Sequence, residues 1–491
     1  MSVVIDAYLK WEKELRQTSD RGALILKEAS VSEEIDAVWF SPVLVELHPS
    51  GPDQTYANTI TAIKGRADIN GPGQVLIDTA ETELLGLLVA WESQLGSAPG
   101  ERAVLYRPEA SDPAMTGGLF TEIKRGPPVL IRPRPIATPR DLIIPSEKNR
   151  TARRSFMGVV DDGLPFLNDA YKDAHGTRIM AIWLQAITNL KHSSTGDLQI
   201  GRVLRAAEIN DLAGRDEASV YRAINRDLFQ PTDLVTVSNA LSHGSHILSV
   251  AAGSYRNALT QDSTPALSTA DQILAVQLEP TTVLDTSARR LNFAVVHAVR
   301  WMMTQAIYAA LADDYGYIPL VVNLSYGAAA GPKDGSGFLE SALRNEIQRY
   351  ERWTNVMLGQ RSPLRVVLPF GNGYRDKLTA VAPAGPAAPV MLNWRLQPDD
   401  RTASYLEVRA QAASNPVLHI LPPGEINELR IQLDEGEYQD YGVHGDTLAR
   451  IFREPDEASD RALYVIATRP TRNFQGSERM APAGAWGIRV G

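Results

Sequence analysis

Three short stretches place side chains suited to acid–base chemistry next to the ends of predicted strands and helices. In the first, an apolar run stops at Asp161, which is followed by Asp162 and Gly163. In the second, His243 directly precedes a helical run of small and apolar residues. In the third, Asn372 lies between two glycines after another apolar run. A carboxylate, an imidazole and an amide can together orient a base, accept a proton and stabilise an oxyanion.

Each of these residues also has a plainer interpretation. Asp161 stands at the carboxyl end of a predicted strand, where sites lie in open α/β sheets, yet Asp-Asp-Gly is also a common loop sequence. A histidine in the first turn of a helix lies near the positive end of the helix dipole, which favours the neutral imidazole that a general base needs. Gly244 would leave room for a substrate beside it. Asn372 equally suits a left-handed turn.

A metal site is the other chemistry that the histidines allow. His243 and His246 are three residues apart, which suits a pair of metal ligands on one helix. No glutamate accompanies them as in the zinc-binding helix motif, so we predict neither a metal nor a cofactor. The chain has no cysteine, which excludes a disulfide, a thiolate nucleophile and a cysteine metal site.

Bulk composition limits the class of protein. The 491 residues are too many for one compact core, so several domains are expected. The net charge of −9 argues against a nucleic-acid partner. The N-terminus carries acids and bases throughout, unlike a secretory signal, and no stretch approaches the roughly 20 apolar residues that span a bilayer. A cytoplasmic protein without nucleic-acid or membrane partners is the simplest expectation.

The pattern along the chain predicts three domains. Residues 1–150 read as a small α/β domain, and the proline-rich and basic stretch 117–154 reads as an extended linker with no central strand. Residues 151–388 alternate apolar strand runs with helical runs, which indicates a doubly wound parallel sheet. Residues 389–491 give short strands with turns between them, typical of a β-sandwich or jelly roll. The strand predictions of the middle domain are 156–160, 179–184, 273–278, 320–324 and 366–370, and its helices are 220–225, 243–252, 288–312 and 338–353.

Four blocks, taken in order, closely resemble the subtilisin-like serine peptidases, or subtilases. They are Val-Val-Asp-Asp-Gly at 159–163, His-Gly-Ser-His at 243–246, Val-Val-Asn-Leu-Ser-Tyr-Gly at 321–327 and Phe-Gly-Asn-Gly at 370–373. The acid precedes the histidine, which is the subtilase order and not that of chymotrypsin. The resemblance covers about 155–388 and implies a subtilisin-like fold. It also implies peptide-bond cleavage through an acyl-enzyme.

The resemblance assigns roles to matching positions. Asp161 would be the triad acid, His243 the general base and Asn372 the oxyanion donor. An exposed strand end would pair through its backbone with an extended polypeptide substrate, as a peptide adds to a sheet edge. That segment is formed by Ser325, Tyr326 and Gly327.

The catalytic serine is the part of the family pattern that this sequence lacks. In the family it lies in a Gly-Thr-Ser-x-Ala-x-Pro block that opens a buried helix after the oxyanion asparagine. The nearest look-alike, at 476–482, has Glu478 at the nucleophile position and runs into a strand pattern. Residues 389–491 are similar to a sandwich insertion of some large subtilases. We therefore expect a downstream segment or a second chain to supply the serine, and apolar sheet surface to await it.

Three functions remain in view at this point, and the third of them is a metal hydrolase that uses His243 and His246. The first is a serine endopeptidase of subtilase type, incomplete in these residues, with residues 1–150 similar to a propeptide domain. On that interpretation the basic stretch 148–154 is a processing site, whereas otherwise it is a solvated linker. The second is a non-catalytic pseudo-peptidase that binds peptides or a partner chain.

Overall fold

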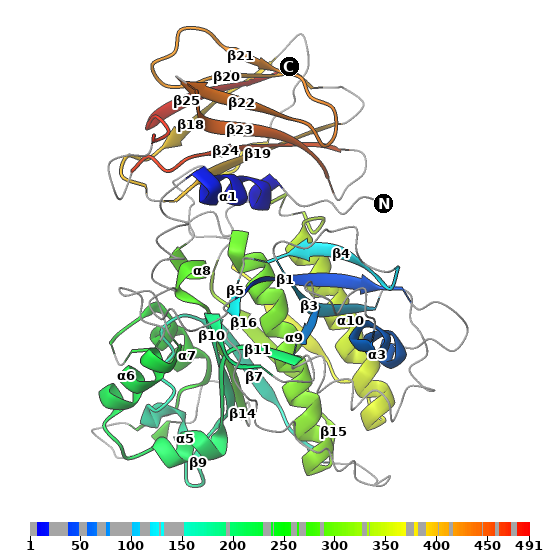
Figure 1. Cartoon of the computed structure of the whole chain (residues 1–491). Coiled ribbons are helices and arrows are strands. Elements are labelled where there is room, and N and C mark those ends of the chain that lie inside the picture. Colours follow the sequence, from blue (N-terminus) through cyan, green and yellow to red (C-terminus); the bar gives the residue numbers. More distant parts are fainter. Residues whose placement is uncertain are drawn as a thin grey trace.

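The computed structural model has three parts: an α/β body, a β-sandwich beyond one end of it, and a helix between the two (Figure 1). Among the described residues, no helix is both long enough and apolar enough to cross a bilayer. The structure describes residues 7–18, 38–48, 56–65, 75–78, 101–108, 118–126, 129–131, 152–192, 197–228, 237–238, 240–256, 263–264, 272–284, 289–326, 331–332, 334–369, 378–381, 389–400, 402–411, 416–443, 445–456, 461–472 and 479–491.

Five parallel strands form the centre of the body. They run in the order β10-β14-β7-β16-β17, so β7 lies in the middle and β17 at the edge of the described sheet. All four pairings between these neighbours are parallel. This mixed α/β architecture agrees with the alternation in the sequence. The bounds are β7 (Phe156–Asp161), β10 (Ile179–His192), β14 (Gln272–Gln277), β16 (Leu320–Leu324) and β17 (Leu364–Val367).

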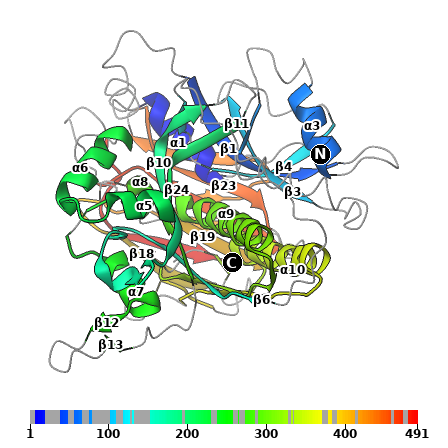
Figure 2. The same ribbon diagram turned by 90° about the horizontal axis from the view of Figure 1, so that it is seen from below.

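Helices lie on both sides of these strands. On one face α9 (Arg289–Asp313) and α10 (Phe338–Leu358) bury side chains such as Val160, Val322 and Leu364 in one core. The opposite face has a second core, around Val159, under three helices. Figures 1 and 2 show these two groups of helices apart. The second group consists of α5 (Ala206–Leu212), α6 (Glu217–Leu228) and α7 (His243–Ala252), while the short α8 (Pro280–Leu284) precedes α9.

The N-terminal strands belong to the same sheet. β5 pairs with β10 at Leu130 and Thr188, and β2 pairs with β11 at Ile77 and Asp197. Because β10 and β11 also pair with each other, strands β10, β11, β2, β3, β1 and β5 close into a ring. The elements are β1 (Val38–Leu47), α3 (Tyr56–Gly65), β2 (Leu76–Asp78), β3 (Arg102–Pro108), β4 (Phe120–Arg125), β5 (Val129–Ile131) and β11 (Asp197–Arg205).

The prediction of a strandless linker over 117–154 is wrong in part. β4 and β5 lie within that range, and β5 is an interior strand between β1 and β10. Both strands fit between the prolines, so no proline has to donate a ladder hydrogen bond within them. Further short elements complete the body. They are β6 (Ala152–Arg153), a 3₁₀ turn at Asp169–Tyr171, β8 (Lys172–Asp173), β9 (Gly176–Thr177), β12 (Tyr255–Arg256), β13 (Ser263–Thr264) and β15 (Tyr315–Tyr317).

Buried polar contacts join the N-terminal strands to the helices of the body. His297 of α9 lies with Nε2 2.9 Å from Asp78 Oδ2, and the Tyr106 hydroxyl donates to the same oxygen at 2.8 Å. Arg300 of α9 pairs with Glu346 of α10 at 2.7 Å and also donates to the Arg102 carbonyl of β3. Buried polar groups are costly unless they are satisfied, so this interface is specific as well as apolar.

The C-terminal residues form two four-stranded antiparallel sheets that enclose their own core, as predicted for a sandwich. One sheet has the order β18-β25-β20-β21, with β18 (Val390–Leu396), β25 (Gly484–Val490), β20 (Leu418–Leu421) and β21 (Leu429–Ile431). The other has the order β19-β24-β23-β22, with β19 (Ser404–Gln411), β24 (Arg461–Thr468), β23 (Asp446–Pro455) and β22 (Tyr438–Val443). The helix α1 (Ala7–Thr18) lies against this second sheet.

Candidate active site

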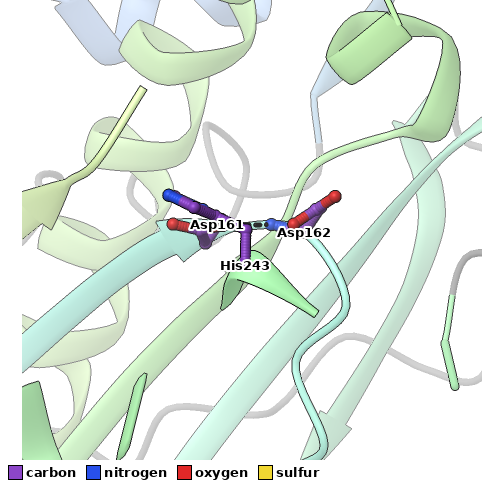
Figure 3. A group of neighbouring side chains, drawn as sticks. All are labelled: Asp161, Asp162 and His243. Carbon is purple, nitrogen blue, oxygen red and sulfur yellow. Dashed lines mark hydrogen bonds and ion pairs between the residues drawn. The ribbon is translucent and has the colours of Figure 1, made fainter. Parts of the chain in front are cut away.

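The structure brings Asp161 and His243 together. His243 Nδ1 lies 2.8 Å from Asp161 Oδ1, within hydrogen-bond distance. The Asp161 side chain is fully buried, whereas the His243 side chain is 46% exposed. Figure 3 shows the two side chains in contact, with Asp162 beside them. When Nδ1 carries the proton it donates to the carboxylate, which leaves Nε2 free to accept a proton.

The turn after β7 brings these two residues close. Gly163 has φ +57°, a left-handed conformation that favours glycine, and a Cβ there would lie 2.5 Å from the Ser242 side chain. The Ser242 hydroxyl donates to the Gly163 carbonyl at 2.7 Å, which ties the start of α7 to the end of β7. The Asp-Asp-Gly sequence thus creates both the acid and the turn that presents it.

Gly244 has a different role from the one expected. A Cβ at this position would lie 1.7 Å from the Asp162 carbonyl oxygen and 3.1 Å from Asp161 Oδ1. The glycine therefore makes room for the backbone of the β7 turn, and the idea that it leaves space for a substrate is not needed to explain it. Any side chain here would push α7, and His243 with it, away from the acid.

Ser242 fixes the first turn of α7. It is the N-cap residue, and its side chain accepts from the Ser245 backbone N–H at 3.0 Å. The Ser245 hydroxyl in turn accepts from the Ser242 backbone N–H at 2.9 Å, which completes a capping box. His243 is therefore the first helical residue, at the positive end of the helix, as the sequence predicts.

Burial controls the charge of Asp161. Removal from water raises the pKa of its carboxyl group from 3.8 to about 6. The hydrogen bond with His243, the Asp162 backbone N–H and the charge of His243 act in the opposite direction. Its Oδ2 atom is buried and has no hydrogen-bond partner within the described part of the chain. The acid is thus a poorly solvated base whose main partner is the imidazole.

The Tyr326 side chain lies against one side of the Asp161–His243 pair. Sequence reasoning did not predict this contact. Its ring centre lies 5.2 Å from that of His243, at an interplanar angle of 51°. Burial raises the pKa of the Tyr326 phenol, and the nearby negative charges of Asp161 and Asp162 and a hydrogen bond to Asp162 raise it further. The hydroxyl therefore stays protonated. The resemblance had pointed only to the backbone at this position, so no signal in the sequence identified the side chain.

The acids and the histidine also form a set of possible metal ligands. One ligand atom from each of Asp161, Asp162 and His243 lies within 4.8 Å of the others. Oxygen and imidazole ligands of this kind suit a divalent transition metal. The pair predicted from spacing, His243 with His246, is not the set that the fold gathers, because His246 stays outside it. The hydrogen bond between Asp161 and His243 uses Oδ1 of the acid and Nδ1 of the imidazole.

The remaining predicted residues divide between described and undescribed positions. Ser325 follows β16 directly, and its hydroxyl accepts from the Asn323 side chain at 2.8 Å. It therefore lies at the same strand-end edge as Asp161. Asn372 and Gly327, for which the sequence predicts an oxyanion donor and a substrate contact, lie outside the described residues. Ser477, within the look-alike of the serine block, lies outside them as well.

No described helix covers one half of the sheet face that carries Asp161. The register places Val321 beside Met157 on one side and beside Arg365 on the other. Two residues further along the strands, Asn323 lies beside the buried Val159 on one side and beside Val367 on the other. Val367 is 53% exposed. Among the described helices, α5, α6 and α7 cover this face over β10, β14 and β7 but not over β16 and β17.

Comparisons with known proteins give distant likeness to solved structures. No family model matches the chain, and no curated protein matches it. Among solved structures, the CspB protease of Clostridium perfringens is similar, with a TM-score of 0.46 and 18% sequence identity. The match covers 70% of this chain and 60% of the CspB chain, so this chain spans less than two thirds of that protein.

Proposed function

We propose that this chain is the acid- and base-bearing part of a subtilisin-like serine endopeptidase. Asp161 orients His243, and His243 takes the proton of a serine hydroxyl as that oxygen attacks a peptide carbonyl. The observation that carries the proposal is the 2.8 Å contact between a fully buried carboxylate and a half-exposed imidazole. A buried partner fixes the tautomer, while exposure leaves the other ring nitrogen accessible to a substrate.

The other groups take their roles from the same edge of the sheet. Ser325 and Tyr326 follow β16 at the carboxyl ends of the strands, and the Tyr326 ring lies beside His243. With Gly327 they offer backbone groups to an extended polypeptide, the substrate class that we propose. Asn372, which follows the next predicted strand in the sequence, would supply the amide for the oxyanion.

We propose that the serine comes from polypeptide outside these 491 residues, either a downstream segment or a second chain. The sequence has no Gly-Thr-Ser-x-Ala-x-Pro block. The half of the Asp161 face that no described helix covers supports the same idea, because a parallel sheet is normally covered on both faces. An apolar helix laid over Val321 and Val367 would cover it, with one end directed towards His243.

The test is active-site labelling in the native host. A fluorophosphonate probe is applied to extracts, and proteins bound to the tagged chain are isolated and digested. We expect the labelled serine to map outside residues 1–491, with labelling lost in the Asp161→Asn and His243→Ala variants. The matched control is His246→Ala, which removes an exposed histidine of the same helix. A labelled serine within the chain would contradict the proposed source of the nucleophile.

A non-catalytic peptide-binding protein is the second candidate, and the missing serine block favours it. It predicts that peptides bind beside Tyr326 and are released uncut, even in the native extract. Binding is measured with an inert, fluorescent, extended peptide, and cleavage with the same peptide by mass spectrometry. Binding that persists with no labelled serine in any associated polypeptide would favour this function over the peptidase.

A further inference from the structure

The second sheet of the sandwich has an apolar surface that is filled by the N-terminal helix. Tyr8 and Trp11 of α1 are buried against Phe452, Val465 and Ala467. Trp11 is fully buried, although a 12-residue helix at a chain terminus has no core of its own. Figure 1 shows α1 lying along β24 and β19, between the sandwich and the body. This apolar surface therefore fits an amphipathic helix with two aromatic residues three positions apart.

Polar contacts frame this apolar centre and set the direction of the helix. Lys10 pairs with Glu454 at 2.8 Å, and the Trp11 indole N–H donates to the Thr468 carbonyl at 3.1 Å. Glu14 lies 3.3 Å from Arg450, whose guanidinium also stacks on the Trp11 ring at 5.7 Å. A buried aromatic anchor surrounded by matched polar pairs is the usual anatomy of a specific interface.

Glu407 of β19 connects this helix with the body of the molecule. Its carboxylate accepts a hydrogen bond from the Tyr8 hydroxyl of α1 and another, at 3.1 Å, from the Gly331 backbone N–H. Arg409 on the same strand donates to it at 2.6 Å. Three segments that are distant in sequence thus share one partly buried carboxylate, and hydrogen bonds to a charged acceptor are the stronger kind.

The loop that contains Gly331 is held to the sandwich at a second point. Arg461 of β24 pairs with Asp334 at 3.0 Å and donates to the Ser336 hydroxyl at 2.5 Å. The loop is described at 331–332 and 334–336, and it starts five residues after Tyr326, which lies against His243. The sandwich and α1 therefore hold the chain immediately downstream of the proposed substrate segment.

We propose that the sandwich carries a helix-binding site for α1, and that the seated helix acts through Glu407 to hold loop 331–336 in place. α1 is then a latch: its release removes the Tyr8 contact and loosens the loop that follows Tyr326. Tyr8 and Glu407 are positioning residues, remote from any reacting atom. The link to substrate binding rests on the proposed function, whereas the mechanical coupling does not.

Hydrogen exchange on the intact chain tests the coupling without any activity. Trp11→Ala removes the side chain at the centre of the contact between α1 and the sheet. We expect amide hydrogen exchange at 7–18 and at 331–336 to become about 10-fold faster, because local opening then costs less free energy. Tyr8→Phe keeps the aromatic ring and removes only the donor, so α1 stays protected while 331–336 exchanges faster. The control is Met391→Ala, an exposed residue of the other sheet.

The β24 amides at 461–468 report whether the sandwich remains folded in each variant. Loss of their protection in Trp11→Ala would mean global unfolding, and Tyr8→Phe and Glu407→Gln then decide the question. Release of α1 with no change at 331–336 would overturn the latch. Unprotected exchange of 7–18 in the unmodified chain would overturn the binding site itself. Neither result would bear on the Asp161–His243 pair.

Discussion

Burial opposes the negative charge of Asp161. Its pKa is raised from 3.8 to about 6 because the carboxylate is buried. The native state therefore binds this proton more tightly than the unfolded chain does. As the pH rises from about 4 to 6, the unfolded carboxyl ionises first, so the free energy of unfolding falls by about 3 kcal/mol on account of this group.

Asp161→Asn removes this ionisation and should remove that part of the pH dependence. We expect the free energy of unfolding of the variant, relative to the unmodified chain, to be higher at pH 7.5 than at pH 4 by about 2–3 kcal/mol. Urea unfolding at the two pH values measures this difference of differences. Asp173→Asn, an exposed acid of a nearby turn, serves as the control. An equal offset at both pH values would refute the raised pKa.

Tyr326 is the residue that we expect to keep water from this acid. Tyr326→Ala should hydrate the carboxylate and lower the pKa of Asp161 by about one unit. Tyr326→Phe keeps the ring against His243 and should have a smaller effect. The measurement is a carbon-13 NMR titration of labelled aspartate, with the Asp161 signal assigned from Asp161→Asn. If both variants leave that pKa unchanged, the ring does not shield the acid.

At the residue scale the sequence predicts the pair but not its surroundings. A strand-end acid and a helix-start histidine are local patterns, so Asp161 and His243 are found without a structure. The approach of the Tyr326 ring depends on the register between β16 and β7, which no local pattern contains. From the sequence Gly244 is interpreted as room for a substrate, whereas the structure shows that a Cβ there would lie 1.7 Å from the Asp162 carbonyl oxygen.

Among the elements, β17 shows most clearly that the described helices leave one side of the sheet uncovered. Its burial alternates, with Leu364 buried under α10 and Arg365 and Val367 exposed on the other face. A strand of a parallel sheet is usually buried on both faces, whereas β17 is buried on one face and exposed on the other, like an edge strand. It is the element at which a further polypeptide would matter most.

We expect Val367→Lys to be harmless in the chain alone and disruptive to assembly. Because Val367 is exposed, the free energy of unfolding should change by less than about 0.5 kcal/mol. Val322→Lys, one strand over and fully buried, should unfold the protein. The two variants are compared by thermal unfolding, and by recovery of the serine-bearing polypeptide from the native host. Normal recovery with Val367→Lys would argue against docking on this face.

Element boundaries were predictable wherever the periodicity was long. The helices predicted at 243–252 and 288–312 agree with α7 and α9 within one residue at each end. β17 begins two residues earlier than predicted. Hydrophobic spacing finds long amphipathic helices better than short strands of a sandwich.

At the scale of the whole molecule, Glu346 is central to the contact between the N-terminal strands and the body. It is buried between Arg300 at 2.7 Å and Arg349 at 3.8 Å. Both arginines also donate to the Arg102 carbonyl of β3. The two positive charges lower the pKa of Glu346 against the effect of its burial, so the group stays ionised.

Glu346→Ala should therefore destabilise the protein by about 3–5 kcal/mol, because the buried Arg300 loses its carboxylate partner while Arg349 keeps only Glu101. Arg361→Ala breaks an ion pair with Glu351, which is on the same helix as Glu346. Because Arg361 is mostly exposed, the expected loss of stability is below about 1 kcal/mol. Urea unfolding compares the two variants, and hydrogen exchange at β3 locates the damage. Equal losses of stability in the two variants would show that burial does not make the Glu346 ion pairs more important than an exposed pair.

The ring of strands β10, β11, β2, β3, β1 and β5 has a consequence for synthesis on the ribosome. Strands β1 to β5 are complete by residue 131, but the hairpin that closes the ring ends only at Arg205. At typical elongation rates the early strands must wait for about 4–15 s with unpaired edges. A nascent chain of this protein is therefore a natural client for chaperones during that interval, and pauses in translation before codon 205 should lower its yield.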